Sequence, residues 1–264
     1  MRVLLLGDVL SKIGRNALKI GLPQLKEYYQ IDLCVANVEN AAGMFGITKK
    51  VKNVISNCGV DIMTSGNHIW DKSEGVELLG LDNDILRPAN YPEDVPGKGH
   101  LITEINGTSV AVINLQGRVF MPAIDCPFRT VDKILRELED NIKIILVDIH
   151  AEATSEKLAM AFYLDGRVSV VVGTHTHVPT ADERILRNGT AYQTDLGMSG
   201  PFDSVIGMKK KETINRFLKG IKQKFKIGGE IPVIEGLFVD IDNRTGKARK
   251  VERILKKIDE KECQ

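Results

Sequence analysis

The stretch "GTHTH", residues 173–177, is the part of the sequence best suited to chemistry. His175 and His177 are one residue apart and follow an apolar run at residues 170–172. The chain has only five histidines, and two imidazoles on one short segment form a chelate for a metal ion. A histidine that only fills a core needs no second histidine two positions away. The pair therefore predicts a metal site whose other ligands come from elsewhere in the chain.

Other polar side chains occur where predicted strands end. They are Asp8, Glu39, Asn40, Asn67, His68 and His150. The carboxyl ends of parallel strands open on a shared crevice, so we expect these residues to meet the histidine pair there. Taken singly, Asp8 also suits a helix N-cap or a turn, Asn67 a turn, and His150 a buried imidazole. These separate explanations do not account for the whole set lying at strand ends. His100 is expected in a loop without a role.

The chemistry of this set points to two metal ions. It contains two carboxylates, two amides and four imidazoles, which are too many ligands for one four-coordinate zinc. The set matches two cations that share a bridging carboxylate. Two metals about 3.5 to 4 Å apart lower the pKa of a bound water and stabilise both oxygens of a phosphoryl displacement. Hydrolysis of a phosphate ester is the natural use of such a site.

Short apolar runs alternate with helical patterns, which predicts a mixed α/β fold. Strands are expected over residues 2–8, 31–40, 60–67, 141–150, 167–175 and 189–197, and helices over 16–29, 48–59 and 155–166. Pro23 is a potential kink or break in the first helix. The opening β-α-β-α-β order implies parallel strands. Hairpins are expected around Asn106-Gly107 and around residues 243–246.

The composition narrows the class of protein. With 264 residues, the chain has a length typical of one domain over residues 1–264. Its formal charge of +1 creates no strong overall electrostatic potential that would attract nucleic acid or an anionic membrane. No signal peptide and no bilayer-spanning run is recognisable. The cysteines are far apart and form no CxxC pair, which is typical of a reducing compartment. They are Cys34, Cys58, Cys126 and Cys263. We therefore expect a cytoplasmic protein.

The ordered blocks "GDV", "NVEN", "GNH", "DIH" and "GTHTH" resemble the calcineurin-like metallophosphoesterase superfamily. The longer strings "GNHIWDK", "RPANYP", "NLQGR", "HAEATSEK" and "GTHTHVPTAD" are similar to the YmdB-type phosphodiesterases of bacteria, over essentially the whole chain. The resemblance implies a layered α/β/β/α sandwich with mixed sheets. It also implies hydrolysis of 2′,3′-cyclic nucleotides to 3′-phosphates, and of other phosphodiesters, by a hydroxide that bridges two metals.

The resemblance also implies a division of the ligands. Asp8, Glu39, Asn40 and His177 would hold one metal, and Glu39, Asn67, His150 and His175 the other. Iron is the metal implied, and manganese or zinc would also accept these ligands. His68 is the implied general acid or phosphate-orienting group. Two positions depart from the general superfamily: Leu10 stands where a histidine is usual, and Ile69 where many relatives have an acid next to His68.

Substrate contacts are less well marked. Arg118 in "NLQGR" is a candidate for the substrate pocket, although a purely structural role fits it equally well. For Glu152, Thr154 and Ser155 we favour a solvated turn and a helix cap over substrate binding.

Residues 208–226 contain eight Lys or Arg and one acid. Their apolar residues Ile214, Phe217, Leu218, Ile221 and Phe225 predict an amphipathic helix whose lysines are its solvated face, rather than an RNA surface.

Other functions remain as alternatives. An amidohydrolase barrel is disfavoured, because its HxH pair belongs near the first strand and the chain shows no eightfold β-α alternation. A metal-dependent nucleotide sensor and a phosphomonoesterase share the candidate residues with a phosphodiesterase, and turnover on defined esters would separate them. A homo-oligomer is also compatible with the sequence.

Overall fold

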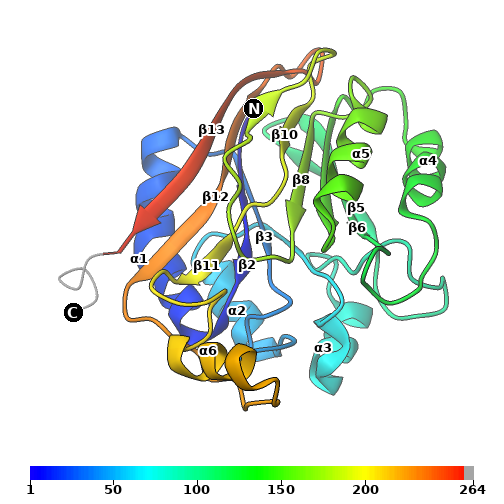
Figure 1. Ribbon diagram of the computed structural model, residues 1–264. Coiled ribbons are helices and arrows are strands. Elements are labelled where there is room, and N and C mark those ends of the chain that lie inside the picture. The colour runs from blue at the N-terminus through cyan, green and yellow to red at the C-terminus, as the bar shows by residue number, and fades with distance from the viewer. Residues whose placement is uncertain (259–264) are drawn as a thin grey trace.

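The computed structural model describes residues 1–258, and its strands form two mixed β-sheets (Figure 1). In the first sheet the order is β2-β11-β12-β1-β3-β4, and β13 also pairs with β12. Its strands are β1 (Arg2–Leu6), β2 (Asp8–Val9), β3 (Leu33–Asn37), β4 (Ile62–Thr64), β11 (Met198–Pro201), β12 (Pro232–Ile241) and β13 (Ala248–Lys257). The pairs β1–β3 and β3–β4 are parallel, which confirms the prediction from the β-α-β-α-β order.

The second sheet has the order β5-β6-β7-β8-β10-β9. Its strands are β5 (His100–Ile105), β6 (Thr108–Gln116), β7 (Ile144–His150), β8 (Val170–Thr174), β9 (Arg184–Ile185) and β10 (Ala191–Gln193). The β5–β6 hairpin turns at Asn106 and Gly107, whose φ values of 50° and 75° suit a primed turn. The expectation for His100 was wrong, because it begins β5 and pairs with Ile113 instead of lying in a loop.

Helices cover the outer faces of both sheets, and the expected layered α/β/β/α sandwich is confirmed. The helices are α1 (Ser11–Tyr29), α2 (Lys49–Asn57), α3 (Ser73–Leu81), α4 (Pro127–Glu137), α5 (Thr154–Leu164) and α6 (Lys210–Lys219), with a short 3-10 helix at Ile69–Asp71. Apolar residues of α1, α2 and α3 share a core with β1 and β3, whereas α4 and α5 share one with β6, β7 and β8.

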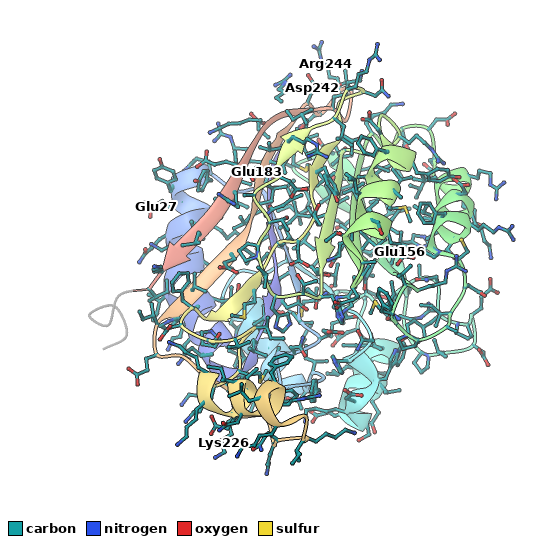
Figure 2. All side chains as sticks on the ribbon, viewed as in Figure 1. Glu27, Glu156, Glu183, Lys226, Asp242 and Arg244 are labelled. Carbon is teal, nitrogen blue, oxygen red and sulfur yellow. The ribbon has the colours of Figure 1, made fainter. Side chains whose placement is uncertain are left out.

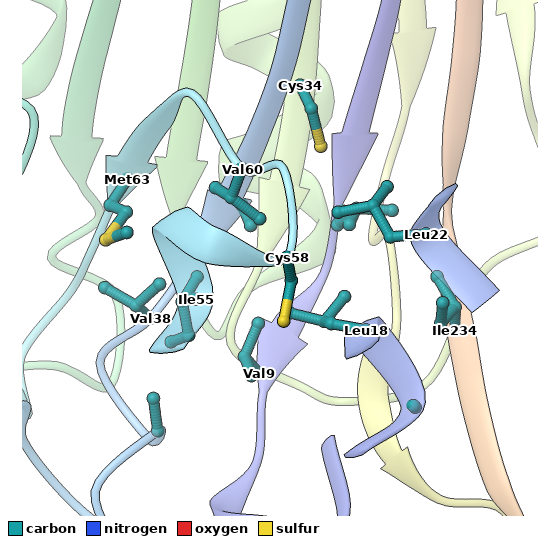
Figure 3. Close-up of a cluster of buried hydrophobic side chains, with 14 of the residues drawn as sticks. Val9, Leu18, Leu22, Cys34, Val38, Ile55, Cys58, Val60, Met63 and Ile234 are labelled. Atoms are coloured by element: carbon teal, nitrogen blue, oxygen red, sulfur yellow. The ribbon is translucent and has the colours of Figure 1, made fainter. Parts of the chain in front are cut away.

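Successive side chains of a strand point to opposite faces of the sheet and so pack into two different cores. In β1, Leu4 and Leu6 face the helical core, and Val3 and Leu5 face the core between the two sheets. Figure 3 shows the helical core, where Leu18 and Leu22 of α1 lie with other buried side chains beside β12. Burial on both faces explains why these strands are nearly continuous apolar runs.

Helix ends agree only in part with the sequence patterns. The start of the helix expected over residues 48–59 is confirmed, because Thr48 caps α2 and its Oγ1 accepts a hydrogen bond from Val51 N at 3.4 Å. Helix α1 begins at Ser11, earlier than expected, and Pro23 lies inside it without ending it. The caps expected at Thr154 or Ser155 were wrong, because α5 is preceded by Ala153 and has no side-chain cap.

The segment of residues 208–226 differs from the amphipathic helix we expected. Helix α6 ends at Lys219, because Gly220 adopts a left-handed conformation with φ of 63°. Phe217 and Leu218 are 80% and 77% exposed, so their apolar face is not packed on the protein. Lys226 lies beyond α6 at the end of the molecule opposite to the β12–β13 turn with Asp242 and Arg244 (Figure 2). The helical pattern correctly predicted a helix for Lys210–Lys219, but the apolar residues of that helix do not form a buried face.

Within residues 1–258, no helix combines the length and apolar character that crossing a bilayer requires. Cys34, Cys58 and Cys126 are free thiols, and Cys263 lies outside the described residues.

Candidate metal centre

The residues predicted for the site converge at the carboxyl ends of strands from both sheets. The first sheet supplies Asp8 in β2, Glu39 and Asn40 after β3, and Asn67 and His68 after β4. The second sheet supplies His150 at the end of β7 and His175 and His177 after β8. One detail differs from expectation: Asp8 does not end β1 but belongs to the separate strand β2, where it pairs with Met198 of β11.

One group of ligand-type atoms surrounds Nε2 of His150. Glu39 Oε1 lies 3.1 Å from this nitrogen, Asn67 Oδ1 lies 3.2 Å away, and His175 Nδ1 lies 3.0 Å away. One ligand atom from each of Glu39, His150 and His175 lies within 4.8 Å of the other two. A carboxylate, an amide oxygen and two imidazoles therefore face a common point.

A second group also adjoins Glu39. His177 Nε2 is 3.3 Å from Asn40 Nδ2 and 3.8 Å from Asp8 Oδ1. Asn40 Nδ2 also lies 3.2 Å from Glu39 Oε1, so Glu39 adjoins both groups. The two groups correspond to the two ligand sets that the family resemblance implies, and their role as ligands stays a prediction.

The atoms of both groups fit a metal ion. Asp8 Oδ1 is buried and has no hydrogen-bond partner among the described residues, which is costly for a carboxylate oxygen. A cation held with His177 would compensate this oxygen. The mixture of carboxylate, amide and imidazole ligands suits iron, manganese or zinc.

The charges of Glu39 and His175 favour metal binding, whereas at His150 the neighbouring Glu39 outweighs burial and raises the pKa to about 9. Burial would raise the pKa of Glu39, but the charge and hydrogen bond of His150 lower it to about 2, so Glu39 is anionic. Burial and the neighbouring His150 lower the pKa of His175 to about 3, so His175 is neutral and its Nδ1 can bind a cation. Burial raises the pKa of Asp8.

His150 is held in place through its second ring nitrogen. Thr174 Oγ1 lies 3.0 Å from His150 Nδ1 and itself donates to Asp148 Oδ1 at 2.9 Å. Gly66 makes room for the ring, because a Cβ at this position would lie 2.1 Å from His150 Cδ2. The glycine of "GNH" is therefore required by the close approach of the imidazole.

The backbone of "GTHTH" turns its two histidines in different directions. His175 and His177 adopt positive φ values of 102° and 61°, which are unusual for residues other than glycine. Between them, Thr176 donates through N and Oγ1 to Asp195 Oδ2, at 3.2 and 2.8 Å. Lys157 Nζ lies 2.6 Å from the same oxygen, and both charged side chains are buried. No local sequence pattern indicates this pair, because Lys157 and Asp195 are far apart in the chain.

His68 lies beside the two groups without belonging to either. Its backbone N donates to Glu39 Oε2 at 2.7 Å, and its Nδ1 lies 2.7 Å from Asp71 Oδ2. The ring of Phe45 stacks on the imidazole with 4.2 Å between centroids. Although Ile69 replaces the usual acid, Asp71 supplies a carboxylate one turn later. The string "GNHIWD" contained this signal, but only the 3-10 turn shows that Asp71 reaches His68.

Of two residues considered for substrate binding, one contacts the candidate metal centre and the other lines a separate cavity. Glu152 lies in an exposed bend, as expected, and its Oε2 in addition lies 3.1 Å from His175 Nε2, a contact that was not expected. Arg118 donates through its backbone N to Glu156 at 3.1 Å, while its exposed side chain lines a large cavity beside α4.

Comparison with known proteins assigns the family. The family model described as YmdB-like protein matches residues 4–254. The chain belongs to the YmdB-like family. A curated relative from Bacillus subtilis, named 2′,3′-cyclic-nucleotide 2′-phosphodiesterase, is 46% identical over 97% of both chains. The family resemblance seen in the sequence is thereby confirmed.

Solved structures agree with the YmdB-like assignment. The chain is 35% identical to a phosphatase from Mycoplasma pneumoniae, with a TM-score of 0.92 over 99% of this chain and 95% of that one. It is 40% identical to a hypothetical protein from Thermus thermophilus, with a TM-score of 0.91 over 97% and 99% of the two chains. An NAD nucleotidase from Haemophilus influenzae, 15% identical with a TM-score of 0.61 over 97% of this chain and 55% of that one, shares the fold.

Proposed function

We propose that the protein, as one domain over residues 1–264, is a metal-dependent phosphodiesterase that opens 2′,3′-cyclic nucleotides to 3′-phosphates. The observation that carries this proposal is the arrangement of two ligand groups that both adjoin Glu39, with His68 next to them. The printed name of the Bacillus subtilis relative supports the substrate class. Other phosphodiesters that fit the same site are further candidates.

The proposed ligands are the two groups around Glu39. Asp8, Glu39, Asn40 and His177 would hold one ion, and Glu39, Asn67, His150 and His175 the other. Iron is the proposed metal, with manganese or zinc as alternatives. Bound there, two cations would supply a nucleophile from water at neutral pH and would neutralise charge on the phosphoryl oxygens. Asn40 can present either its oxygen or its nitrogen by rotation of the amide, and only the oxygen serves as a ligand.

His68 is the proposed general acid. Asp71 accepts from Nδ1, so Nε2 is the nitrogen left to protonate the leaving 2′-oxygen. Its side chain is 31% exposed, so a substrate can reach it. The hydrogen bond from its backbone N to Glu39 fixes its position relative to the shared carboxylate.

Glu152 has a proposed positioning role. Its contact with Nε2 of His175 selects the ring tautomer in which Nδ1 is free for a cation.

Elemental analysis of the purified protein, combined with a panel of cyclic nucleotides, other phosphodiesters and phosphomonoesters, tests the function. We expect two metal ions per chain and the highest kcat/KM on 2′,3′-cyclic nucleotides. Hydrolysis of monoesters alone would replace the proposal with a phosphatase, as the Mycoplasma pneumoniae neighbour is named. Two bound metals with no turnover of any ester would support a nucleotide sensor instead.

Two variants separate the roles within the site. Glu39→Gln should abolish turnover and lower metal content, because it weakens both ligand groups. His68→Ala should lower kcat while both metals stay bound. Loss of metal in His68→Ala would make His68 a ligand, and full metal occupancy in Glu39→Gln would disprove the shared carboxylate.

The proposed location is the cytoplasm. The three free cysteines of the described residues, Cys34, Cys58 and Cys126, support a reducing compartment.

A further inference from the structure

A cavity of about 1020 Å³ lies beside the metal centre, between α4, the start of β5 and the loop of residues 87–99. Among the charged residues that line the cavity, Arg and Lys outnumber Asp and Glu. They are Arg87, Lys98, Arg118, Arg129 and Lys133, against Glu93, Asp125 and Glu137. With a formal charge of only +1 for the whole protein, this concentration of cations is local.

Several of these cations have no anionic partner. Within residues 1–258, the side chains of Lys98, Arg118 and Arg129 donate no hydrogen bond and form no ion pair. Of the carboxylates that line the cavity, Glu93 is already paired with Lys133 at 2.6 Å. The cavity therefore has positive charge available for an anion.

Arg87 adds a buried cation to the same cavity. Only 6% of the residue is exposed, and its buried Nε has no hydrogen-bond partner in the described part of the chain. Its Nη1 donates to the carbonyls of Pro88 and Ala89, at 2.9 and 3.3 Å, and its Nη2 donates to the carbonyl of Pro92 at 3.5 Å. No described carboxylate forms an ion pair with it. The charge of Glu93 acts on this guanidinium, but Glu93 is paired with Lys133, so Arg87 adds a buried positive charge that a bound anion would stabilise further.

The amino end of α4 also favours an anionic ligand in this cavity. Cys126 precedes the helix, provides no side-chain cap, and lines the cavity together with Thr130 of the first turn. The first turn contains no acidic residue, so the positive end of the helix dipole is uncompensated. Because α4 connects the parallel strands β6 and β7, its amino end lies on the side of the sheet where these strands end, as His150 does.

The cavity and the metal centre share a wall. Gln116, which pairs with His150 in the sheet, precedes Arg118 by two residues. Tyr91 lines the cavity, donates to Gln116 Oε1 at 3.2 Å, and packs its ring 5.0 Å from that of Trp70. Trp70 follows His68 by two residues, so a bound molecule can extend from one site to the other.

We propose that this cavity binds the nucleotide on the 5′ side of the cyclised residue, with its phosphate held by Arg129 and the amino end of α4. The preferred substrate is then an oligoribonucleotide that ends in a 2′,3′-cyclic phosphate. A cyclic mononucleotide carries a single phosphate, which the metal centre would occupy, so only a longer substrate brings the second one. This inference rests on the proposed function, and the cavity has room for a further nucleotide.

Hydrolysis of two matched substrates tests the inference. We compare 2′,3′-cyclic AMP with the diadenosine ribonucleotide that ends in a 2′,3′-cyclic phosphate. The wild-type protein should favour the dinucleotide by about tenfold in kcat/KM, as one charge-assisted contact allows. Arg129→Gln should lower kcat/KM for the dinucleotide only. Arg136→Gln is the control, because Arg136 is exposed on the same helix and does not line the cavity.

Binding of hydrolysis products separates this inference from the proposed function. Calorimetry with the diadenosine 3′-phosphate should give tighter binding than adenosine 3′-phosphate, and Arg129→Gln should remove the difference even if neither cyclic ester is hydrolysed. Equal affinity for the two products in the wild type would overturn the inference. The inference would also be overturned if the wild type bound a second equivalent of mononucleotide, showed no preference for the dinucleotide, and lost affinity for that second equivalent in Arg129→Gln. The cavity would then hold a separate effector.

Discussion

At the scale of single residues, the contact between Asp71 and His68 determines which imidazole nitrogen faces the substrate. Asp71→Asn should lower kcat on 2′,3′-cyclic nucleotides by about ten- to hundredfold, because the ring loses its orienting carboxylate. Metal content should stay the same, since neither residue belongs to the ligand groups. Asp82→Asn is the control, because Asp82 follows α3 and contacts Lys52 at 3.6 Å. An unchanged kcat in Asp71→Asn would contradict the positioning role.

Gly66 gives a second test at this scale. A methyl group on Gly66 would collide with the His150 ring, so Gly66→Ala should displace the imidazole and release metal. Displacement of about 1 Å is enough for a hundredfold loss of kcat/KM. Gly80→Ala is the matched control, because a Cβ there would meet only Pro96, at 3.9 Å. Elemental analysis and kinetics measure both variants, and full metal content in Gly66→Ala would refute the argument.

The sequence predicted much of the site at the residue scale and missed the residues that act through tertiary contacts. "GNH" and "GTHTH" carry their chemistry in local spacing, so they could be recognised directly. Glu152 reaches His175 from the segment after another strand, and its ordinary turn position gave no signal. Asp71 was visible in the sequence, but its contact depends on a short 3-10 turn.

At the scale of elements, the buried pair of Lys157 and Asp195 connects α5 to the "GTHTH" loop. Lys157→Met should destabilise the protein by about 3 to 5 kcal/mol, because Asp195 is left buried and unpaired. Lys157→Met combined with Asp195→Asn should cost less than Lys157→Met alone. Urea denaturation measures the free energies of unfolding. Lys133→Met, which breaks an exposed pair with Glu93, should leave the midpoint unchanged.

The prediction of a buried helix face failed where the apolar residues of the helix pack against no other element. The apolar residues of α6 follow a helical pattern, yet Ile214, Phe217 and Leu218 remain exposed. Strand prediction succeeded better, because each core strand is buried on both faces and appears as an apolar run. The short strand β2 was missed, since two residues give no periodic signal.

At the scale of the whole molecule, Glu235 in β12 links stability to pH. Burial raises the pKa of Glu235 from 4.5 to about 7, opposed by the hydrogen bond from Met198 N. Between these pH values the unfolded chain releases the proton and the folded protein keeps it. The contribution of Glu235 to the free energy of unfolding therefore falls as the pH rises through this window.

Glu235→Gln removes this dependence. The variant should match the wild type near pH 4 and exceed its free energy of unfolding by about 1 to 3 kcal/mol at pH 8. Chemical denaturation of both proteins at several pH values measures the difference. A difference that stays constant with pH would show that ionisation of Glu235 is not the cause.

The order of elements predicted a mixed α/β fold, and the family resemblance implied the layered sandwich, but neither could predict how strands from the two ends of the chain pair within one sheet. That arrangement depends on long-range contacts such as β12 beside β1, which join residues more than two hundred positions apart. No local pattern records such a pairing.

The two sheets contribute different chemistry to the candidate centre. Carboxylates and amides come from the first sheet, and the imidazoles of His150, His175 and His177 come from the second. A chain that has formed only one sheet therefore lacks three or four of the seven proposed ligands. Hydrolytic competence, on this arrangement, arises only after both halves have folded and docked, so an immature chain is inert toward phosphoesters.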